Sequence, residues 1–287
     1  MNNWNEVRIM GIIGIGNECY LYVNGICTSK PIWLHDTVCL CPAKPAIKWQ
    51  EVMQLFENDI DFSIAVLCNP TIASQLHVIG DNANHLLANA WNSQWDCILL
   101  GALFNHNVMC NLQSNQPIEQ IANAEYVHIT NYELRALLTE VYHISEKDEI
   151  WLKNHYKTAY KLLEKENFQT GVHAMASYRW HSLPRVQLAV IWSGIESLFN
   201  VNTEVSFRIS LYIANFLGET EVQMQQIFKQ VRKMYSLRSS AVHGNKTKDN
   251  LNSAVIESAN LLNQILRRCT ELNKLPDIYN LVFLSFK

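Results

Sequence analysis

The chain has 287 residues and a mass of 33.1 kDa, which suggests two domains or one large domain. Its composition is 48% hydrophobic and 17% charged with few Gly and Pro, so wholesale disorder, collagen-like structure and low-complexity architecture are excluded. The net charge of −3 divides unevenly: residues 1–145 hold five Lys and Arg against thirteen Asp and Glu, a charge of −8, and residues 146–287 hold eighteen against thirteen, a charge of +5.

This charge asymmetry has two interpretations. The basic half either meets an anionic partner or is an ordinary solvated helical domain. No apolar run approaches the roughly 20 residues that span a bilayer, and the N-terminus lacks a basic region followed by an apolar stretch. We therefore expect a cytoplasmic protein without a membrane partner and, because the cytosol is reducing, free and buried cysteines.

The first half is expected to be rich in short strands. Apolar segments bounded by turn-forming residues lie at 8–15, 19–23, 32–40, 62–67, 76–79, 97–104 and 108–112. Asn24-Gly25 between two apolar runs predicts a hairpin, because both turn residues tolerate positive φ. Helices are predicted near 49–58 and 82–91. Residues 1–145 are therefore predicted to form a β-rich mixed domain.

Three glycines near the N-terminus, Gly11, Gly14 and Gly16, resemble a phosphate-binding loop only superficially. Such a loop needs a helix directly after it, whose N–H groups meet the phosphate. Residues 17–23 instead predict a strand, so the glycines indicate a turn or a bulge.

His35, Cys39 and Cys41 would supply three zinc ligands, but a structural zinc site uses four, usually with Cys-x2–4-Cys spacing. Cys39 and Cys41 share one face of a predicted strand, where core residues are expected. The tryptophans of this half, Trp49, Trp91 and Trp95, are likewise expected in the core. We predict no metal and no cofactor.

From about residue 131, apolar residues recur every three or four positions, as in amphipathic helices. Helices are predicted at 132–141, 148–166, 168–180, 184–199, 204–217, 221–237 and 251–272. Pro184 suits the first turn of a helix, and Asp249 or Asn250 suits an N-cap. The short connections favour antiparallel neighbours. Residues 146–287 are therefore predicted to form an all-α bundle, which makes the whole chain α+β.

The helix predicted at 221–237 leads into a basic segment. Its apolar stripe consists of Ile227, Val231, Met234 and Tyr235. Arg238 continues this stripe and needs an anionic partner, because burying an unpaired guanidinium is costly. His243 lies about 140° further around an ideal helix. The two groups therefore meet one ligand only if the helix ends or distorts between them, or if two copies of the motif meet.

The motif Arg238-x4-His243-Gly, with Tyr235 just upstream, resembles the signature of HEPN domains, in particular of the Apea-like branch. That branch also has an upstream helix of the type Leu-Glu-x-Leu-Phe, which is similar to Ile-Glu-Ser-Leu-Phe at 195–199. The resemblance covers about residues 147–272 and does not cover the first half. It implies a helical bundle that forms a homodimer, in which two Arg-x4–6-His motifs build one composite site.

The resemblance also implies a metal-independent endoribonuclease, in which the 2′-OH of RNA attacks the neighbouring phosphate. His243 titrates near neutrality and suits the acid or the base, and the guanidinium of Arg238 suits the charge that builds on the phosphorane. Ser239 takes the place of a polar residue that often follows the arginine, and Glu196 is expected to pair with Arg238 or orient the site. Basic residues expected to follow the RNA backbone are Lys229, Arg232, Lys233, Lys246 and Lys248.

By the same resemblance, a prokaryotic source would imply a toxin-like protein or one in antiviral defence. The acidic first half would then be a sensor or regulatory module for the ribonuclease. Two alternatives remain open. One is a non-catalytic HEPN scaffold that binds RNA or a protein. The other is a buried polar network of Arg238, Glu196 and His243 that fixes helix register without chemistry.

Overall fold

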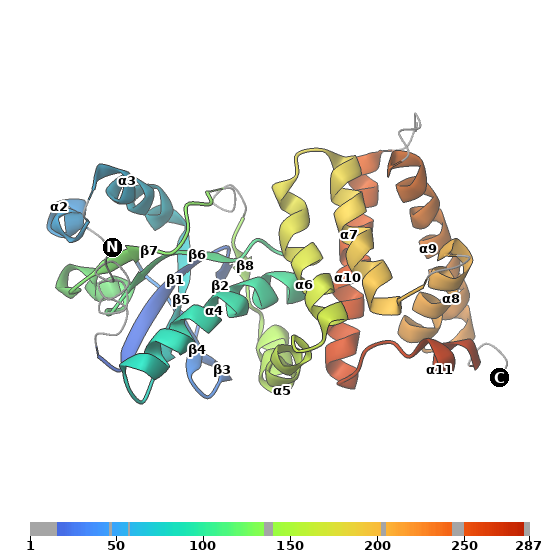
Figure 1. The fold of residues 1–287 in the computed structure, drawn as a ribbon, viewed down its shortest axis with the longest axis horizontal. Helices are drawn as coiled ribbons and strands as arrows, with labels where there is room; N and C mark the ends of the chain where they lie inside the picture. The colour runs from blue at the N-terminus through green and yellow to red at the C-terminus, as the bar shows by residue number, and fades with distance from the viewer. Residues whose placement is uncertain are drawn as a thin grey trace, which may run out of the picture. The chain divides into compact units, whose positions relative to one another are not determined.

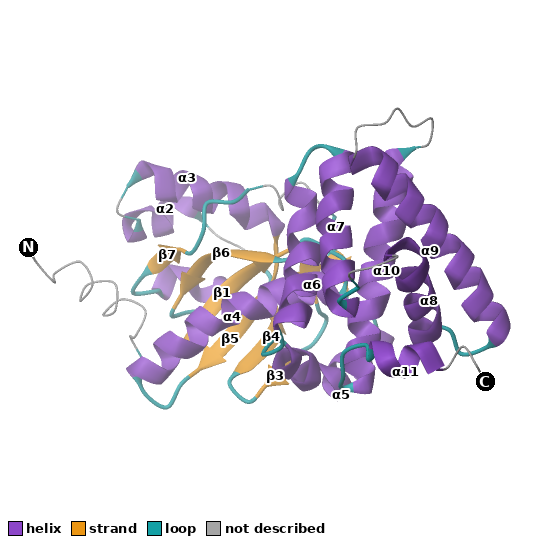
Figure 2. Ribbon diagram, turned by 45° about the vertical axis from the view of Figure 1, so that its right-hand side comes forward, coloured by secondary structure: helices purple, strands orange, loops and turns teal. Residues whose placement is uncertain are grey.

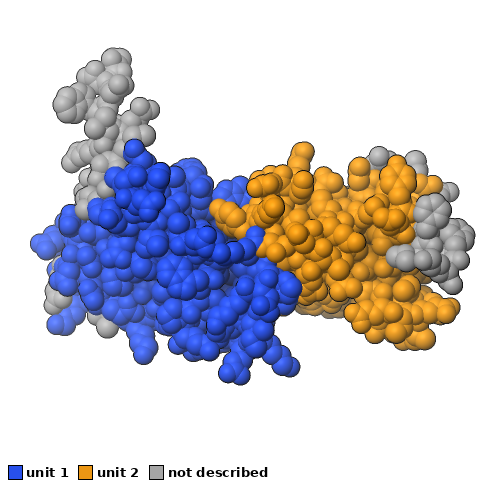
Figure 3. Space-filling view, turned by 90° about the horizontal axis from the view of Figure 1, so that it is seen from below, with its two compact units in different colours: residues 1–100, 106–157 blue, residues 101–105, 158–287 orange. Residues whose placement is uncertain are grey.

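The computed structural model describes residues 16–45, 48–56, 58–134, 140–201, 205–242 and 250–283. The architecture is α+β, as predicted: an antiparallel sheet in the N-terminal part precedes a helical C-terminal part (Figures 1 and 2). The chain divides into two compact units (Figure 3). Unit 1 contains residues 1–100 and 106–157, and unit 2 contains residues 101–105 and 158–287. The predicted domain boundary at residue 145 remains a prediction.

Unit 1 is built on a sheet. Its described strands are β1 (Glu18–Asn24), β2 (Ile26–Cys27), β3 (Ile32–His35), β4 (Val38–Pro42), β5 (Ile72–Ile79), β6 (Met109–Ser114), β7 (Val127–Ile129) and β8 (Tyr142–His143). The helices that begin in this unit are α2 (Trp49–Val52), η1 (Met53–Leu55), α3 (Asp59–Cys68), η2 (Asn69–Thr71), α4 (Ala83–Leu103), η3 (Ile118–Asn123) and α5 (Glu146–Leu162). The main sheet has the order β3-β4-β5-β1-β6-β7 with antiparallel neighbours, and β2 pairs with β8 in parallel.

The alternation of side chains along β1 assigns the two faces of the sheet. Tyr22 is fully buried in a cluster with residues of α2, α3 and η3, which cover one face. Leu21 is also fully buried but points to the other face, where its cross-strand partner is Gln113 of β6. Gln113 shares a cavity wall with residues of α4, so α4 covers that second face.

Two segments predicted as strands are helical. Residues 62–67 belong to α3, whose first turn is capped by Asn58: the Asp61 N–H donates to Asn58 Oδ1 at 2.9 Å. Residues 97–103 form the end of α4, where Leu99, Leu100 and Leu103 are all fully buried. A helix end that is buried on every side shows no amphipathic period, so its sequence resembles a core strand.

Gly25 does not form the predicted hairpin. The chain leaves β1 there and enters β2, which pairs with β8 and not with β1. Gly25 has a φ of +88°, and a Cβ atom on it would lie 1.7 Å from the carbonyl oxygen of Asn107. Glycine is therefore required by a positive φ together with a close backbone approach. The φ of Asn24 is not positive. Its side-chain amide instead donates a hydrogen bond to Asn111 Oδ1.

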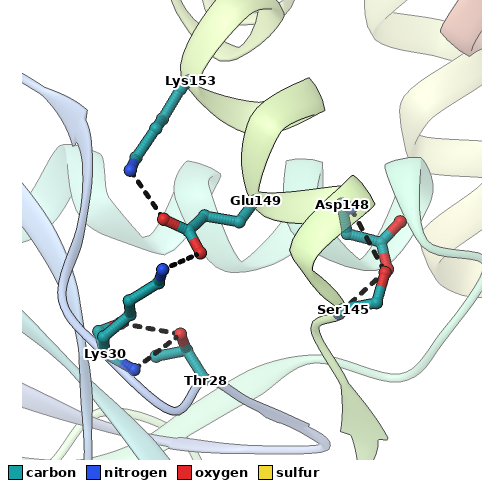
Figure 4. Close-up of polar contacts among 6 residues, drawn as sticks. All are labelled: Thr28, Lys30, Ser145, Asp148, Glu149 and Lys153. Carbon is teal, nitrogen blue, oxygen red and sulfur yellow. Dashed lines mark hydrogen bonds and ion pairs between the residues drawn. The ribbon is translucent and has the colours of Figure 1, made fainter.

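The start of α5 is fixed to unit 1 by a compact polar cluster (Figure 4). Glu149, whose side chain is only 8% exposed, accepts from Lys153 Nζ at 2.6 Å and from Lys30 Nζ at 2.9 Å. The hydroxyl of Ser145 donates to Asp148 Oδ2 at 2.6 Å and accepts from the Asp148 N–H, which caps the helix. The hydrogen bonds from both lysines hold the pKa of Glu149 below its usual value.

Unit 2 is helical. Its described helices are α6 (Glu166–Ser177), η5 (Tyr178–Trp180), α7 (Pro184–Phe199), α8 (Val205–Leu217), α9 (Glu221–Val242), α10 (Leu251–Leu272) and α11 (Ile278–Phe283). The predictions for 184–199 and 251–272 match α7 and α10, and Asn250 caps α10 by accepting from the Asn252 N–H. Residues 132–134 are not helical, contrary to the predicted helix at 132–141, and 135–139 lie outside the described residues. Every described helix of the chain is too short or too polar to cross a bilayer.

Helix α7 packs closely against α6 and α10. A Cβ atom on Gly194 would lie 2.7 Å from Ala174 Cβ of α6, so only glycine permits this approach. Trp192 is fully buried, and its indole Nε1 donates to Ser258 Oγ of α10 at 3.1 Å. These contacts fix the rotation of α7 and thereby the direction in which Glu196 points.

Candidate functional site

Glu196 and Arg238 meet between α7 and α9, as expected from the sequence. Glu196 lies on a helix whose neighbouring positions Ile195 and Leu198 are buried. Arg238 follows the buried stripe of Val231 and Met234 on α9 and precedes the buried Ala241. Each side chain is thus placed at the edge of an apolar face by the helical period of its own segment.

The Glu196–Arg238 pair is half-buried and loose. Arg238 Nη2 lies 3.4 Å from Glu196 Oε1 and 3.5 Å from Glu196 Oε2, with side-chain exposures of 19% for the arginine and 27% for the glutamate. Arg238 Nε is buried and has no hydrogen-bond partner among the described residues. The arginine is therefore held beside a carboxylate while part of its donor capacity is unused.

Aromatic rings support the arginine. The Arg238 guanidinium lies 5.6 Å from the ring centroid of Tyr235, in a cation–π arrangement. The Tyr235 ring meets Trp192 edge to face, with centroids 5.2 Å apart. Burial and the negative charge of Glu196 raise the pKa of Tyr235, while the charge of Arg238 opposes this rise. The hydroxyl therefore stays protonated near neutral pH and is directed to the Glu196 carboxylate.

The other residues predicted for this site are placed in three different ways. Ser239 is half-buried on α9 beside Arg238. Lys229, Arg232 and Lys233 are exposed on the same helix. His243, Lys246 and Lys248 lie outside the described residues, and α9 is described up to Val242.

The three described basic residues do not surround Arg238 on α9. At about 100° per residue, Lys229, Arg232 and Lys233 lie roughly 120–180° around the helix from Arg238. They form one exposed stripe, which we call the basic stripe. Arg232 of this stripe also lies 5.9 Å from the ring centroid of Phe228. Arg238 and the basic stripe therefore occupy different faces of the same helix.

Sequence reasoning missed the support of Trp192 by Ser258, and the expectation of a core position for Trp91 was wrong. Trp91 is 76% exposed on α4. Its spacing of four residues from Trp95 indicates a shared helix face, but not whether that face is covered.

The weaker sequence signals have structural explanations. His35 Nε2 lies 3.2 Å from Asp96 Oδ2, and Cys39 and Cys41 lie side by side with their sulfur atoms 3.6 Å apart. All eight cysteines are free thiols, and all but Cys27 and Cys41 are buried. Gly16 has a positive φ, while Gly11 and Gly14 lie outside the described residues.

No family model matches the sequence, and neither a curated protein nor a solved structure matches the chain.

Proposed function

We propose that unit 2 carries a metal-independent endoribonuclease site of HEPN type, in which Arg238 and His243 act on RNA and two protomers complete one site. The observation that supports this proposal most is the half-buried Glu196–Arg238 pair with its partly unused guanidinium. A guanidinium that is fixed by a carboxylate and an aromatic ring and keeps part of its surface exposed suits an anionic ligand with several oxygen acceptors. A phosphodiester is such a ligand.

In this proposal Arg238 binds the scissile phosphate and stabilises the charge that develops on the phosphorane. His243 transfers protons, since its ordinary pKa near neutrality suits both removal of the 2′-OH proton and protonation of the leaving 5′-oxygen. Glu196 is a positioning residue that holds the guanidinium, and Ser239 supplies a further hydroxyl beside it. A requirement for the 2′-OH restricts cleavage to RNA.

The basic stripe favours a second candidate function. Lys229, Arg232 and Lys233 are exposed on a face of α9 away from Arg238, where they offer a separate surface for a phosphate backbone. A scaffold of HEPN type that binds RNA without cleaving it would use this surface and would leave the Glu196–Arg238 pair as a structural contact. This candidate predicts RNA binding that survives loss of Arg238.

The test is incubation of the purified full-length protein with total tRNA and a structured RNA in the presence of EDTA, followed by analysis of the cut ends. We expect cleavage by the wild type that leaves 2′,3′-cyclic phosphate, and no cleavage by His243→Ala. An all-2′-deoxy strand of the same sequence serves as the substrate control and should remain intact.

Absence of cleavage by the wild type, with RNA binding retained in a gel-shift assay, would contradict the nuclease and favour the scaffold. Equal cleavage by the wild type and His243→Ala would contradict the role given to His243. Size-exclusion chromatography with light scattering on the same preparations checks the dimer that the composite site requires.

A further inference from the structure

Helices α8 and α9 pack side by side in unit 2 and bring two phenylalanines together (Figures 1 and 2). The rings of Phe207 on α8 and Phe228 on α9 meet edge to face, with centroids 5.6 Å apart and an interplanar angle of 78°. Phe207 is 50% exposed, and Phe228 is half-buried. The contact therefore fixes the orientation of a ring that still presents apolar surface to solvent.

The two rings lie in a basic surface. The Arg232 guanidinium lies 5.9 Å from the Phe228 ring centroid, and Arg208 is exposed one residue after the α8 ring. Residues 205–217 of α8 and 222–242 of α9 together hold five Lys and Arg and no Asp or Glu. The charge of these two helices is thus complementary to an anionic partner.

Phe228 lies between the two charged faces of α9. At about 100° per residue, it lies roughly 80° around the helix from Arg238 and roughly 40° from Arg232. Along the helix axis it lies about 15 Å from Arg238, at about 1.5 Å per residue. A strand that crosses the aromatic pair can therefore contact the basic stripe on one side and approach Arg238 on the other.

Aromatic rings beside phosphate-binding groups select the form of a nucleic acid. Lys and Arg attract the backbone of a single strand and of a duplex alike. Stacking on a side chain requires an unpaired base, because the bases of a duplex already cover one another. A surface with both kinds of group therefore favours a single strand over a duplex.

We propose that Phe207 and Phe228 form a stacking platform for an unpaired base of single-stranded RNA, whose phosphates lie along the basic stripe. The choice of RNA rests on the proposed function. The preference for an unpaired base rests on the two rings and on the charges around them. The platform serves a nuclease and a non-cleaving scaffold equally.

The test is fluorescence anisotropy of the full-length protein with a labelled, unpaired 2′-O-methyl RNA of about 12 nucleotides. The methyl groups remove the 2′-OH nucleophile, so affinity is measured without cleavage. The comparison set is the same strand in a duplex and an abasic strand of equal length, which keeps the backbone and lacks the bases. We expect the unpaired strand to bind about tenfold more tightly than either.

Phe207→Ala and Phe207→Leu should weaken binding of the unpaired strand about fivefold or more and leave binding of the abasic strand unchanged. Phe207→Tyr keeps the ring and should retain most of the affinity. Tyr279→Ala is the matched control, because Tyr279 is a 78% exposed aromatic residue of the same unit, on α11. It should leave all affinities unchanged, and circular dichroism should show the wild-type fold for every variant.

Equal affinity for the unpaired, duplex and abasic strands would overturn the platform, as would the absence of binding to all three. Unchanged affinity in Phe207→Ala would also overturn it, and a simultaneous loss of dimerisation would assign the rings to a protein interface. Base-dependent binding that Phe207→Ala weakens, together with no cleavage of unmodified RNA by the wild type, would support the platform while contradicting the nuclease.

Discussion

Two glutamates, one in each unit, pair with basic side chains in different ways. Glu149 of unit 1 is 8% exposed and bonds two lysines at 2.6 and 2.9 Å. Glu196 of unit 2 is 27% exposed and faces one arginine at 3.4 and 3.5 Å, and the Nε of that arginine has no partner among the described residues. The first carboxylate is fully engaged by protein groups. The second makes only loose contacts with its arginine, whose buried Nε is left without a partner among the described residues.

Under the proposed function, this difference separates an ion pair that supports the fold from one that binds a ligand. Both Glu149 carboxylate oxygens make short contacts and have little capacity left for a ligand: one accepts from Lys30 and attaches α5 to the β2–β3 segment, and the other accepts from Lys153 of α5 itself. The loose Glu196–Arg238 pair lies on two packed helices, and partial desolvation of both charges lowers the stability of the fold. Their long contacts offset little of this cost, as is expected of charged groups that are kept for ligand binding.

Stability should fall most when Trp192, which packs against Tyr235 next to the Glu196–Arg238 pair, is removed. Trp192→Ala leaves a cavity beneath Tyr235 and an unpaired Ser258, so the free energy of unfolding of unit 2 should fall by about 3–5 kcal/mol. Urea denaturation followed by circular dichroism measures it. Trp192→Phe is the control, since it keeps most of the packing and should cost clearly less. Equal losses in the two variants would contradict the packing role.

The two glutamates should separate activity from stability. Glu196→Gln releases the guanidinium of Arg238, and RNA cleavage should fall roughly tenfold to hundredfold while Tm changes little, because misplacing a catalytic group is costly in rate. Glu149→Gln should lower Tm and leave cleavage unchanged. Cleavage rates and melting curves on the same preparations test both, and a reversed pattern would refute the contrast.

The pH dependence of stability tests whether Glu149 is charged and paired in the folded protein. Its pKa is lowered below the ordinary value of 4.5, mainly by the hydrogen bonds from Lys153 and Lys30. A depressed folded-state pKa contributes stability above 4.5 that is lost as the pH falls below it. The difference in Tm between wild type and Glu149→Gln should therefore shrink as the pH is lowered from neutral to acid. A constant difference would show that the pKa is not depressed.

The smallest effect concerns the basic stripe. Replacing Lys229, Arg232 and Lys233 by Ala should weaken RNA binding and reduce the slope of log K against log salt by about 2, since each lost phosphate contact removes about 0.7 from a single-strand slope. Filter binding at several salt concentrations measures this slope. The replacements should leave the cleavage rate at saturating RNA unchanged, because the stripe faces away from Arg238. An unchanged slope would exclude the stripe from the RNA-binding surface.

Elements of the fold could be predicted from the sequence where the residues that determine them lie within the element itself. α10 was predicted to its ends, because its apolar face is regular and Asn250 caps it in the sequence itself. The end of α4 was mistaken for a strand, since burial on all sides removes the period that distinguishes the two. The turn at Gly25 was wrongly predicted as a hairpin, because glycine is required there by the close approach of the Asn107 backbone, which lies far along the chain.

The same distinction applies to the sites. The resemblance to HEPN domains led to the expectation that Glu196 pairs with Arg238 or orients the site, and the two side chains do pair. The separation of the basic stripe from Arg238 also follows from helical spacing, although the sequence interpretation grouped them. The exposure of Trp91 was beyond sequence reasoning, because it depends on which neighbouring elements cover that face of α4.

The most direct test of the central claim is a paired measurement on Arg238→Ala. The claim is that Arg238 is held for RNA and not for the fold. We expect cleavage in EDTA to fall about 100-fold or more, as when a preorganised donor to a developing oxyanion is removed. The free energy of unfolding should fall by about 1–3 kcal/mol and the protein should stay folded, because the Glu196 side chain is 27% exposed while its Oε1 atom is buried. Wild-type cleavage by Arg238→Ala, or loss of cleavage only together with unfolding, would contradict the account.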